Sequence, residues 1–518
     1  MIIRRLLARL TPAVAVVLVG LLGSVLALWA ASAGAAAGAA TIFVVASLVL
    51  WSTGFRSVGL WVRAAVARRS RDDEGHEAPA AAPDLRVALV YCVADDADLP
   101  AIATSMRQDV PVATVILDDS RDPDAQARLD AFAAAYGCRI IRRAQRSGYK
   151  AGNLNHGLAA LRGEFDAYLL CDSDVVLPPD LARRCASALA DPTVAVAQAL
   201  PTARPGRSWF SRYFGPLLET HLETTRRGRE AAGVVALLGR GALVRAAAID
   251  DVGGVPEVVA EDLALSVALR RRGWRLVNVD VAFAEDYPID YRSFRTQMRK
   301  TTEGAVEFLR RPGQLRGWQG RGRLDVLLET ALVPLAALAG VAAMVSGVSL
   351  AMHGTTPPLW AMALTALSAV APLIPEATRR TRVQRPAAGV VFLLLAGVLY
   401  SSVMFVVLSA VVRTAIGRRA VFWITPKAQR TLGVRQLVDL LRAELVLAPA
   451  IAAAALVAAG SPVAALAPLG PVLCALAFAV TLVARRTVGQ PVQTKPAAVA
   501  AVLPDPSPRA MTGVGARA

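Results

Sequence analysis

Long apolar runs near both ends of the chain enclose a segment in which polar and apolar residues alternate over short distances. The first two runs cover residues 12–30 and 40–62, and each is long enough to cross a bilayer as a helix. A signal peptide begins in the same way, but here a second apolar run follows at once. Because arginines lie within the first ten residues, we predict two transmembrane helices over residues 1–62 with the N-terminus in the cytosol.

The second half of the chain contains five further apolar runs. They cover residues 326–352, 357–375, 387–412, 445–459 and 463–484. The basic segments 379–385 and 413–442 flank the third run, and both should lie on the cytosolic side. A spanning helix over 387–412 would place them on opposite sides, yet that run is long enough to span. The sequence therefore leaves six or seven transmembrane helices open, with a membrane region over 326–485 and a disordered tail over 486–518.

The middle of the chain has the pattern of an α/β domain. Residues 63–84 are polar and rich in Ala and Pro, which predicts a linker, and the domain follows over 85–325. Apolar runs predict strands over 86–93, 112–117, 138–141, 165–171 and 193–197, with helices over 124–136 and 151–161 between them. Strands that alternate with helices indicate a mostly parallel sheet, whose ligands bind at the carboxyl ends of the strands.

Composition narrows the class of protein further. The chain has 518 residues, 55% of them hydrophobic, and a formal net charge of +17. Its arginines cluster beside apolar runs, which fits membrane topology better than nucleic-acid binding. Five scattered cysteines without a CxxC pair indicate reduced thiols rather than a disulfide framework or a metal site.

Acidic residues follow two of the predicted strands. The second strand ends at Asp118-Asp119-Ser120 and the fourth at Asp172-Ser173-Asp174. Side chains two residues apart on an extended chain point the same way, so Asp172 and Asp174 can face one ligand. A divalent cation that carries a diphosphate suits such a pair, because Mg²⁺ binds one or two carboxylates together with phosphate oxygens. A solvated turn is the alternative for one acidic pair, but two clusters on one edge of the sheet favour a ligand site.

Two more segments point to the same edge. Residues 148–155 (GYKAGNLN) bring Lys150 to the start of a helix, where free amides and a cation suit phosphate, although an ordinary glycine turn is the alternative. Glu261 and Asp262 open an amphipathic run. Acids in a first helical turn complement the helix dipole, and the functional alternative is a general base.

Taken in order, these motifs resemble the membrane-embedded family 2 glycosyltransferases, which include the cellulose and hyaluronan synthases. The motifs are VALVYCVADD (87–96), ILDDS (116–120), GYKAGNLN (148–155), CDSD (171–174), AED (260–262), QMRKTTEG (297–304) and FWITPK (422–427). The resemblance covers about residues 85–427 and the membrane helices. It implies a nucleotide-sugar-binding domain of the glycosyltransferase A-type, inserted between transmembrane helices. It also implies a nucleotide-diphospho-sugar donor, Mg²⁺ or Mn²⁺, and inversion at the anomeric carbon.

The resemblance also implies roles for individual residues. The donor would be bound by Asp96, Asp119, Lys150, Asn153, Asp172, Glu261, Thr425 and Lys427. Asp172 and Asp174 would hold the metal ion, and Asp262 would take the proton from the acceptor hydroxyl, with Glu261 as its main rival. Gln297 and Lys300 would belong to the catalytic group.

The segment 422–427, here called the FWITPK loop, would cover the donor and bring Thr425 near the diphosphate. A membrane anchor is the alternative, because Trp and Lys favour the interface.

One departure from the family affects the expected product. The family motif QxxRW reads Gln297-Met298-Arg299-Lys300-Thr301 here, so the glutamine and a cation remain but the Trp is lost. In the family that Trp stacks on the acceptor sugar, and its loss weakens the case for processive synthesis. We predict an inverting transferase at the cytoplasmic membrane with a cytosolic catalytic domain. It would extend a glycan and export it through its own helices or with partners. The alternatives are a non-processive transferase to a lipid-linked acceptor and an inactive nucleotide-binding subunit of an export complex.

Overall fold

The computed structural model describes residues 2–74, 83–206, 208–315, 321–423, 425–427, 431–459 and 465–483. The predicted tail over 486–518 lies outside the described residues, and so does part of the predicted linker. The first part of that linker is helical, because the second helix runs on to Glu74 instead of ending near residue 62.

A seven-stranded sheet forms the centre of the soluble part, in the order β3-β2-β1-β4-β6-β5-β7. The strands are β1 Val87–Val93, β2 Val112–Asp118, β3 Arg139–Arg142, β4 Ala167–Asp172, β5 Val194–Ala203, β6 Ala242–Arg245 and β7 Arg275–Glu285. Strand β6 pairs antiparallel with β4 and β5, and the other four pairings are parallel. The predicted mostly parallel sheet is thus confirmed, with β6 and β7 as strands that the sequence prediction omitted.

Helices cover both faces of the sheet, which explains the nearly continuous apolar runs of its central strands. The helices of this part are α3 Leu99–Ser105, α4 Pro123–Tyr136, α5 Tyr149–Ala160, α6 Leu181–Ala188, α7 Trp209–Glu230, α8 Ala246–Asp251, α9 Glu261–Arg271 and α10 Tyr291–Leu309. Side chains of α3, α4 and α6 fill the core on one face, and those of α5, α8 and α9 fill the core on the other. Both cores stop at the carboxyl ends of β1, β2 and β4, where polar residues begin.

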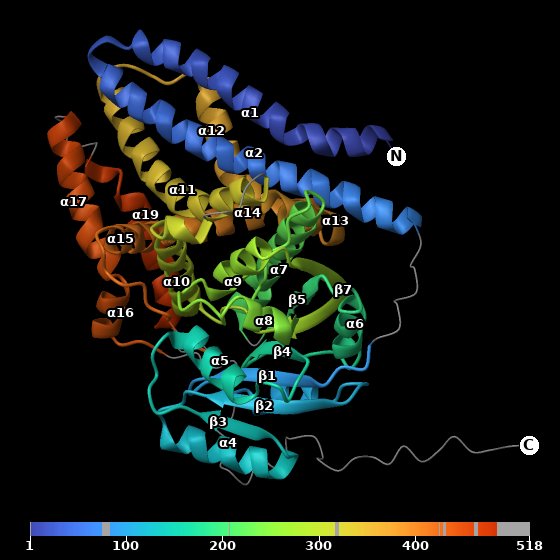
Figure 1. Cartoon of the computed structure of the whole chain (residues 1–518). Coiled ribbons are helices and arrows are strands. Elements are labelled where there is room, and N and C mark those ends of the chain that lie inside the picture. The colour runs from blue at the N-terminus through green and yellow to red at the C-terminus, as the bar shows by residue number, and fades with distance from the viewer. Residues whose placement is uncertain are drawn as a thin grey trace, which may run out of the picture.

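The remaining helices, most of them apolar, gather on one side of the sheet domain (Figure 1). They are α1 Ile2–Ala31, α2 Ala37–Glu74, α11 Arg321–Met352, α12 Leu359–Val370, α13 Ile374–Val383, α14 Pro386–Ser402, α15 Met404–Ala415, α16 Val434–Leu440, α17 Arg442–Ala459 and α19 Leu469–Ala479. Among the described residues, five helical stretches are long and apolar enough to cross a membrane, or six if the bent pair α16–α17 is one span. The sequence allowed six or seven. The difference comes from the last run, whose described helix over Leu469–Leu482 is short.

Helix α10 connects the sheet domain to the apolar helices. Arg295 on α10 pairs with Glu444 on α17, with Nη1 2.7 Å from Oε1, and these side chains are only 4% and 1% exposed. The same guanidinium donates to the carbonyl oxygen of Leu440 over 2.7 Å. A buried charge pair of this kind is costly to break, because it leaves the other charge without a partner. It therefore fixes α10 relative to α16 and α17, and so frames the segment that runs between α15 and α16.

Candidate active site

The carboxyl ends of three adjacent strands bring the predicted acidic residues together. In the parallel register Cys92 of β1 lies opposite Asp172 of β4, and Val93 lies opposite Asp118 of β2. Asp96 follows β1 by three residues, and Asp174 follows β4 by two. The two acidic clusters predicted from the sequence therefore share one edge of the sheet.

Lys150 lies at the centre of this edge. Its Nζ is 2.7 Å from Oδ1 of Asp172 and 3.5 Å from Oε1 of Glu261, and it donates to the carbonyl oxygen of Gly239 over 3.2 Å. The chain reaches this position through a left-handed turn, with φ of 68° at Gly148 and 51° at Tyr149. A positive φ at Tyr149 is uncommon for a residue with a side chain, and it places Lys150 in the first turn of α5.

Charges around Asp172 keep this carboxylate ionised. Burial alone would raise the pKa of Asp172, but Lys150 and then Arg240 lower it well below its usual range. Burial likewise disfavours the charged form of Lys150, yet Asp172 and Glu261 raise the pKa of Lys150 above its ordinary value. The pKa of Glu261 is raised by burial, although Lys150 opposes the shift. The centre of the site thus holds a fixed ion pair with a second, less acidic carboxyl beside it.

A second lysine approaches the acids from the FWITPK loop. Nζ of Lys427 lies 3.2 Å from Oδ2 of Asp96 and 3.2 Å from Oδ1 of Asp174, and it bonds to Oγ of Ser173. Ser173 in turn donates to Oδ2 of Asp96 over 2.8 Å. Burial would lower the pKa of Lys427, but Asp174 and Asp96 outweigh it and raise the pKa. Each carboxylate of the Asp172/Asp174 pair therefore contacts a lysine, from α5 of the sheet domain in one case and from the segment between α15 and α16 in the other.

Aromatic residues of the FWITPK loop rest on α10 and α5. The ring of Phe422 has Nζ of Lys300 3.5 Å from its centroid and stacks with the ring of Tyr149 at 6.4 Å. A cation over an aromatic face is attractive, most strongly where water is excluded. The loop is also fixed further on, because Oγ of Ser293 donates to the carbonyl oxygen of Pro426 over 2.8 Å. Lys300 thus contacts the loop as well as contributing its charge to the site.

Trp423 of the FWITPK loop is held against α10 by two residues of that helix, Arg299 and Glu303. Nε1 of Trp423 donates to Oε2 of Glu303 over 3.3 Å, and the guanidinium of Arg299 lies 4.4 Å from the centroid of its ring. Arg299 and Glu303 are themselves paired, 2.8 Å apart. Thr301, at the position of the family's Trp, is exposed. An aromatic ring therefore lies beside this part of α10, but it comes from the loop.

Other predicted site residues have structural partners. Asp119 receives two bonds from Arg143, at 2.9 and 2.7 Å, and Arg143 also donates to the carbonyl oxygens of Ser147 and Tyr149. Asn153 is buried and donates to the carbonyl oxygen of Leu117 over 3.0 Å, which holds α5 against β2. These bonds account for both side chains without a ligand, so their predicted contacts with the donor remain predictions.

The remaining predicted residues, Gln297, Thr425 and Asp262, are partly buried. Gln297 and Thr425 are half-buried, on α10 and in the FWITPK loop. Asp262 is half-buried at the start of α9, and its Oδ1 accepts from the backbone N–H of Leu263 over 2.7 Å. His156, the histidine nearest to the GYKAGNLN motif, is exposed on α5.

Sequence reasoning missed three charged residues that organise the site. Arg143 orients Asp119, Glu303 holds the loop, and Arg240 pairs with Glu285 while lowering the pKa of Asp172. Each of these residues contacts a segment that is far away in the sequence, so no local residue spacing predicts the contact. Of the three, only Arg240 offered a local signal, as a single charge within the apolar stretch ALLGRGALV (236–244).

The acidic pair fits a hard divalent cation that arrives with phosphate. Among the described residues, no group of three His, Cys, Asp or Glu side chains is placed to form a metal cage. Asp172 and Asp174 nevertheless supply two carboxylates within three residues at the end of β4. Mg²⁺ typically takes one or two such ligands and completes its shell with substrate phosphates and water. The side chains present are therefore suited to a metal bound together with a diphosphate.

The chain is similar in sequence to one known protein and in fold to several solved structures. A protein named "Probable glucomannan 4-beta-mannosyltransferase 15" from Arabidopsis thaliana is 26% identical over 207 residues, which cover 38% of this chain and 38% of that relative. The structure of mannosyltransferase PcManGT from Pyrobaculum calidifontis, in complex with GDP-Man and Mn²⁺, shares 17% identity over 71% of this chain and 99% of its own, with a TM-score of 0.49. S. aureus TarS shares 16% identity over 58% of this chain and 55% of its own, with a TM-score of 0.32.

A family model matches a stretch of the chain that contains part of the site. The model described as "Glycosyl transferase family group 2" matches residues 169–416, from within β4 to the end of α15. That stretch contains Asp172, Asp174, Asp262 and the Gln297–Lys300 segment. The family predicted from the motifs is confirmed for residues 169–416, which match glycosyl transferase family group 2.

Proposed function

We propose that this chain is an inverting glycosyltransferase that moves a sugar from a nucleotide-diphospho-sugar to a growing glycan at the cytoplasmic membrane. The observation that carries the proposal is the double lysine contact with one acidic pair. Lys150 contacts Asp172, and Lys427 contacts Asp174, at the carboxyl edge of a mostly parallel sheet. A diphosphate with its divalent cation needs acids for the metal and cations for the phosphates, and this edge of the sheet contains both.

The lysines would stabilise the leaving group. Negative charge builds up on the diphosphate as the glycosidic bond to the donor breaks, and cations fixed beforehand stabilise that charge with little rearrangement. Lys150 and Lys427 are held by carboxylates, and Lys300 is held over Phe422. Mg²⁺ or Mn²⁺ bound at Asp172 and Asp174 would neutralise part of the same charge.

Asp262 remains our candidate for the general base. Glu261 lies 3.5 Å from Lys150 and is nearly fully buried, so it is already engaged with the cation that would face the donor. Asp262 begins the same helix but is half-buried, which leaves it accessible to an acceptor hydroxyl. An inverting transfer needs one base on the acceptor side, opposite the leaving group.

The FWITPK loop would act as a lid over the donor. Its contacts with α10 and with Asp96, Ser173 and Asp174 support this role, because they join the membrane region directly to the acidic edge. Closing such a loop would exclude water from the reacting sugar and complete the set of cations. Thr425 would then lie near the diphosphate.

Membrane embedding is the second part of the proposal. It is supported by the five apolar helices and by the four arginines between residues 374 and 385, which fit a cytosolic face. In the polymer-forming version the helices would also carry the product outward. In the alternative version the enzyme adds one sugar to a lipid-linked acceptor. The exposed Thr301 at the position of the family's Trp favours that alternative.

Product analysis tests these versions. Purified protein is incubated with radiolabelled nucleotide sugars, including GDP-mannose and UDP-sugars, with Mg²⁺ or Mn²⁺ and membrane lipid extract. If the unchanged protein transfers sugar and the Asp174→Asn protein does not, the result supports the proposed glycosyltransferase activity. A ladder of polymer sizes then supports processive synthesis, and one added sugar supports the lipid-linked acceptor. If the protein shows no transfer and no donor hydrolysis with any sugar, the inactive nucleotide-binding subunit is favoured.

A further inference from the structure

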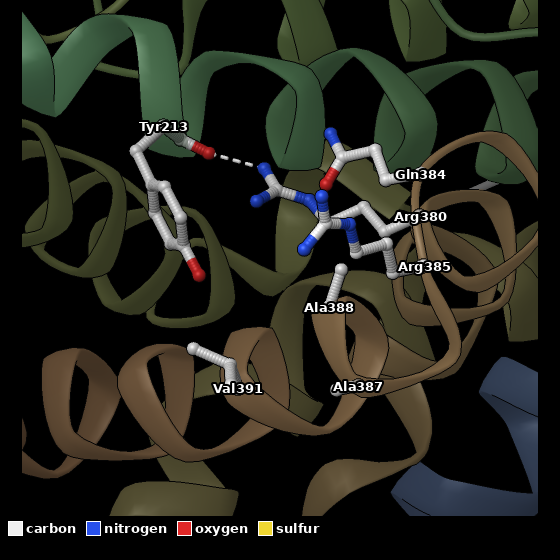
Figure 2. A pocket seen from close by; sticks show the side chains of 7 residues that line it. All are labelled: Tyr213, Arg380, Gln384, Arg385, Ala387, Ala388 and Val391. Atoms are coloured by element: carbon white, nitrogen blue, oxygen red, sulfur yellow. Dashed lines mark hydrogen bonds between the residues drawn. The ribbon is translucent and has the colours of Figure 1, made fainter.

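A pocket of about 400 Å³ lies outside the candidate active site, where the sheet domain meets the apolar helices. It is formed by α7, α13 and α14, and Figure 2 shows its lining: Tyr213, Arg380, Gln384, Arg385, Ala387, Ala388 and Val391. The lining changes character across the pocket, from guanidinium and amide groups on one side to small and apolar side chains of α14 on the other. It is therefore shaped for a ligand that has a polar end and an apolar end.

Arg380 is the fixed cation of this pocket. It is buried, its Nε lies 2.7 Å from Oε1 of Glu376, and it donates to the carbonyl oxygen of Tyr213. Its guanidinium also lies 4.5 Å from the ring centroid of Tyr213 and 4.4 Å from that of Phe392. These contacts hold the group in place, so a ligand would meet a positive charge that needs no further ordering.

Arg385 supplies a second positive charge without a counter-charge. Its side chain is exposed, and within the described part of the chain it forms neither an ion pair nor a hydrogen bond. Residues 374–385 contain four arginines and one acid, Glu376, which is already shared by Arg379 and Arg380. The surface at the end of α13 therefore carries an excess of positive charge beside the pocket, and it attracts an anion.

An exposed apolar stripe leads away from the pocket along α14. Val391 lines the pocket, and Leu394 and Leu395, three and four positions later, follow on the same side of the helix. The three side chains are 48%, 66% and 41% exposed. The helix is also the start of the candidate membrane span Pro386–Ala415. The basic end of the pocket thus coincides with the beginning of the span, which is the depth of lipid head groups.

We propose that this pocket binds an anionic glycerophospholipid of the membrane. Its phosphodiester would lie between Arg380 and Arg385, and one acyl chain would follow the Val391–Leu395 side of α14. Arginine suits phosphate because its planar group presents several donors at once, and a basic residue at the membrane surface attracts anionic lipid. The inference rests on the membrane embedding proposed above and is independent of sugar transfer. The bound lipid would bridge α14 to α7 of the sheet domain through Tyr213 and Arg380.

Lipid retention by variants tests the pocket. Purified full-length protein in detergent micelles is titrated with phosphatidylglycerol or phosphatidylcholine, and native mass spectrometry records the lipid adducts. Arg385→Gln should weaken the tightest phosphatidylglycerol adduct by about five-fold, because one basic residue near the surface is lost. Arg382→Gln is the matched control, since Arg382 is exposed on the same segment, carries the same charge and does not line the pocket. Equal effects of the two substitutions, or none, would overturn the proposal.

A second pair of variants tests the apolar end. Val391→Ser should also weaken the adduct, whereas Val390→Ser, at an exposed position outside the pocket, should leave it unchanged. Inorganic phosphate added as a competitor should not displace the lipid, and displacement would show a site for free anions instead. Extraction of the membrane fraction with carbonate tests membrane embedding separately from lipid binding. Release of the protein would refute membrane embedding, while retained protein with equal adducts in all variants refutes only the lipid site.

Discussion

Replacing Lys427 by Gln should make the acidic pair bind a divalent cation more tightly when no donor is present. In the structure the ammonium group lies 3.2 Å from both Asp96 and Asp174 and bonds to Ser173. A cation that binds Asp174 must therefore displace this lysine first. The substitution removes the competing positive charge while keeping a side chain of similar length.

The size of the effect follows from those contacts. A hydrogen bond to a charged group contributes about 1.5–3 kcal/mol. The Lys427 side chain is 25% exposed, and solvent screening moves the contribution toward the lower end, about 1.5 kcal/mol. Since 1.4 kcal/mol corresponds to a factor of ten, the Mn²⁺ dissociation constant should fall about ten-fold. Donor turnover should fall instead, because the loop loses its contact with the acids and the diphosphate loses a cation.

Electron paramagnetic resonance of free Mn²⁺ gives the dissociation constant without any catalysis. Arg419→Gln is the matched control, because Arg419 precedes the FWITPK loop, is exposed and forms no ion pair with the described residues. Mn²⁺ binding that is unchanged or weaker in the Lys427→Gln protein would refute the idea that this lysine occupies the metal position. Turnover equal to that of the control would refute the role of the loop as a lid.

Three further substitutions test the roles of single residues. Asp174→Asn should abolish metal-dependent donor turnover while the protein stays folded and in the membrane fraction. The control is Asp180→Asn, because Asp180 lies nearby and pairs with Arg184, and this variant should keep its activity. Equal turnover rates in the two variants would show that Asp174 is not a metal ligand. Asp262→Asn should abolish transfer but not donor binding measured by calorimetry, and an active Asp262→Asn beside an inactive Glu261→Gln would exchange the two roles. Thr425→Ala should raise the KM for the donor or lower kcat by about ten-fold, and normal kinetics would return this segment to a membrane anchor.

The first five strands could be predicted because each is a short apolar run that ends at a turn or an acid. Strands β6 and β7 could not be recognised by that criterion. Strand β6, Ala242–Arg245, lies within a longer apolar stretch, VVALLGRGALVRAAAI (234–249), so it has no apolar boundaries of its own. Strand β7 is half-buried at one edge, with Asn278 and Asp280 within it. The alternation around these polar residues was the available signal, and it is typical of a strand with one solvated face.

The site could be predicted in part, because parallel strands place their carboxyl ends on one edge. That rule predicts Asp119 and Asp172 at the same edge of the sheet. It could not show that Asp119 is held by Arg143, or that Asn153 holds a strand rather than facing the opening. Both contacts depend on side-chain directions and on loops, which hydrophobic periodicity does not determine. The membrane helix count has a similar limit, since apolar character over 463–484 does not reveal that the described helix there, Leu469–Leu482, is short.

Helix α10 contacts both the apolar helices and the FWITPK loop. One side of it carries Lys300, whose charge reaches the site, and the same helix holds the FWITPK loop through Ser293 and Glu303. Through Arg295 it is fixed to Glu444 of α17 by a buried ion pair. A shift of α10 relative to the apolar helices would therefore move the loop and a site cation together, whereas a shift of the loop alone would have to break its bonds to α10. If the loop is the proposed lid, opening the site requires two sets of contacts to separate: those of the loop with Ser293 and Glu303 on α10, and those of Lys427 with the acidic edge.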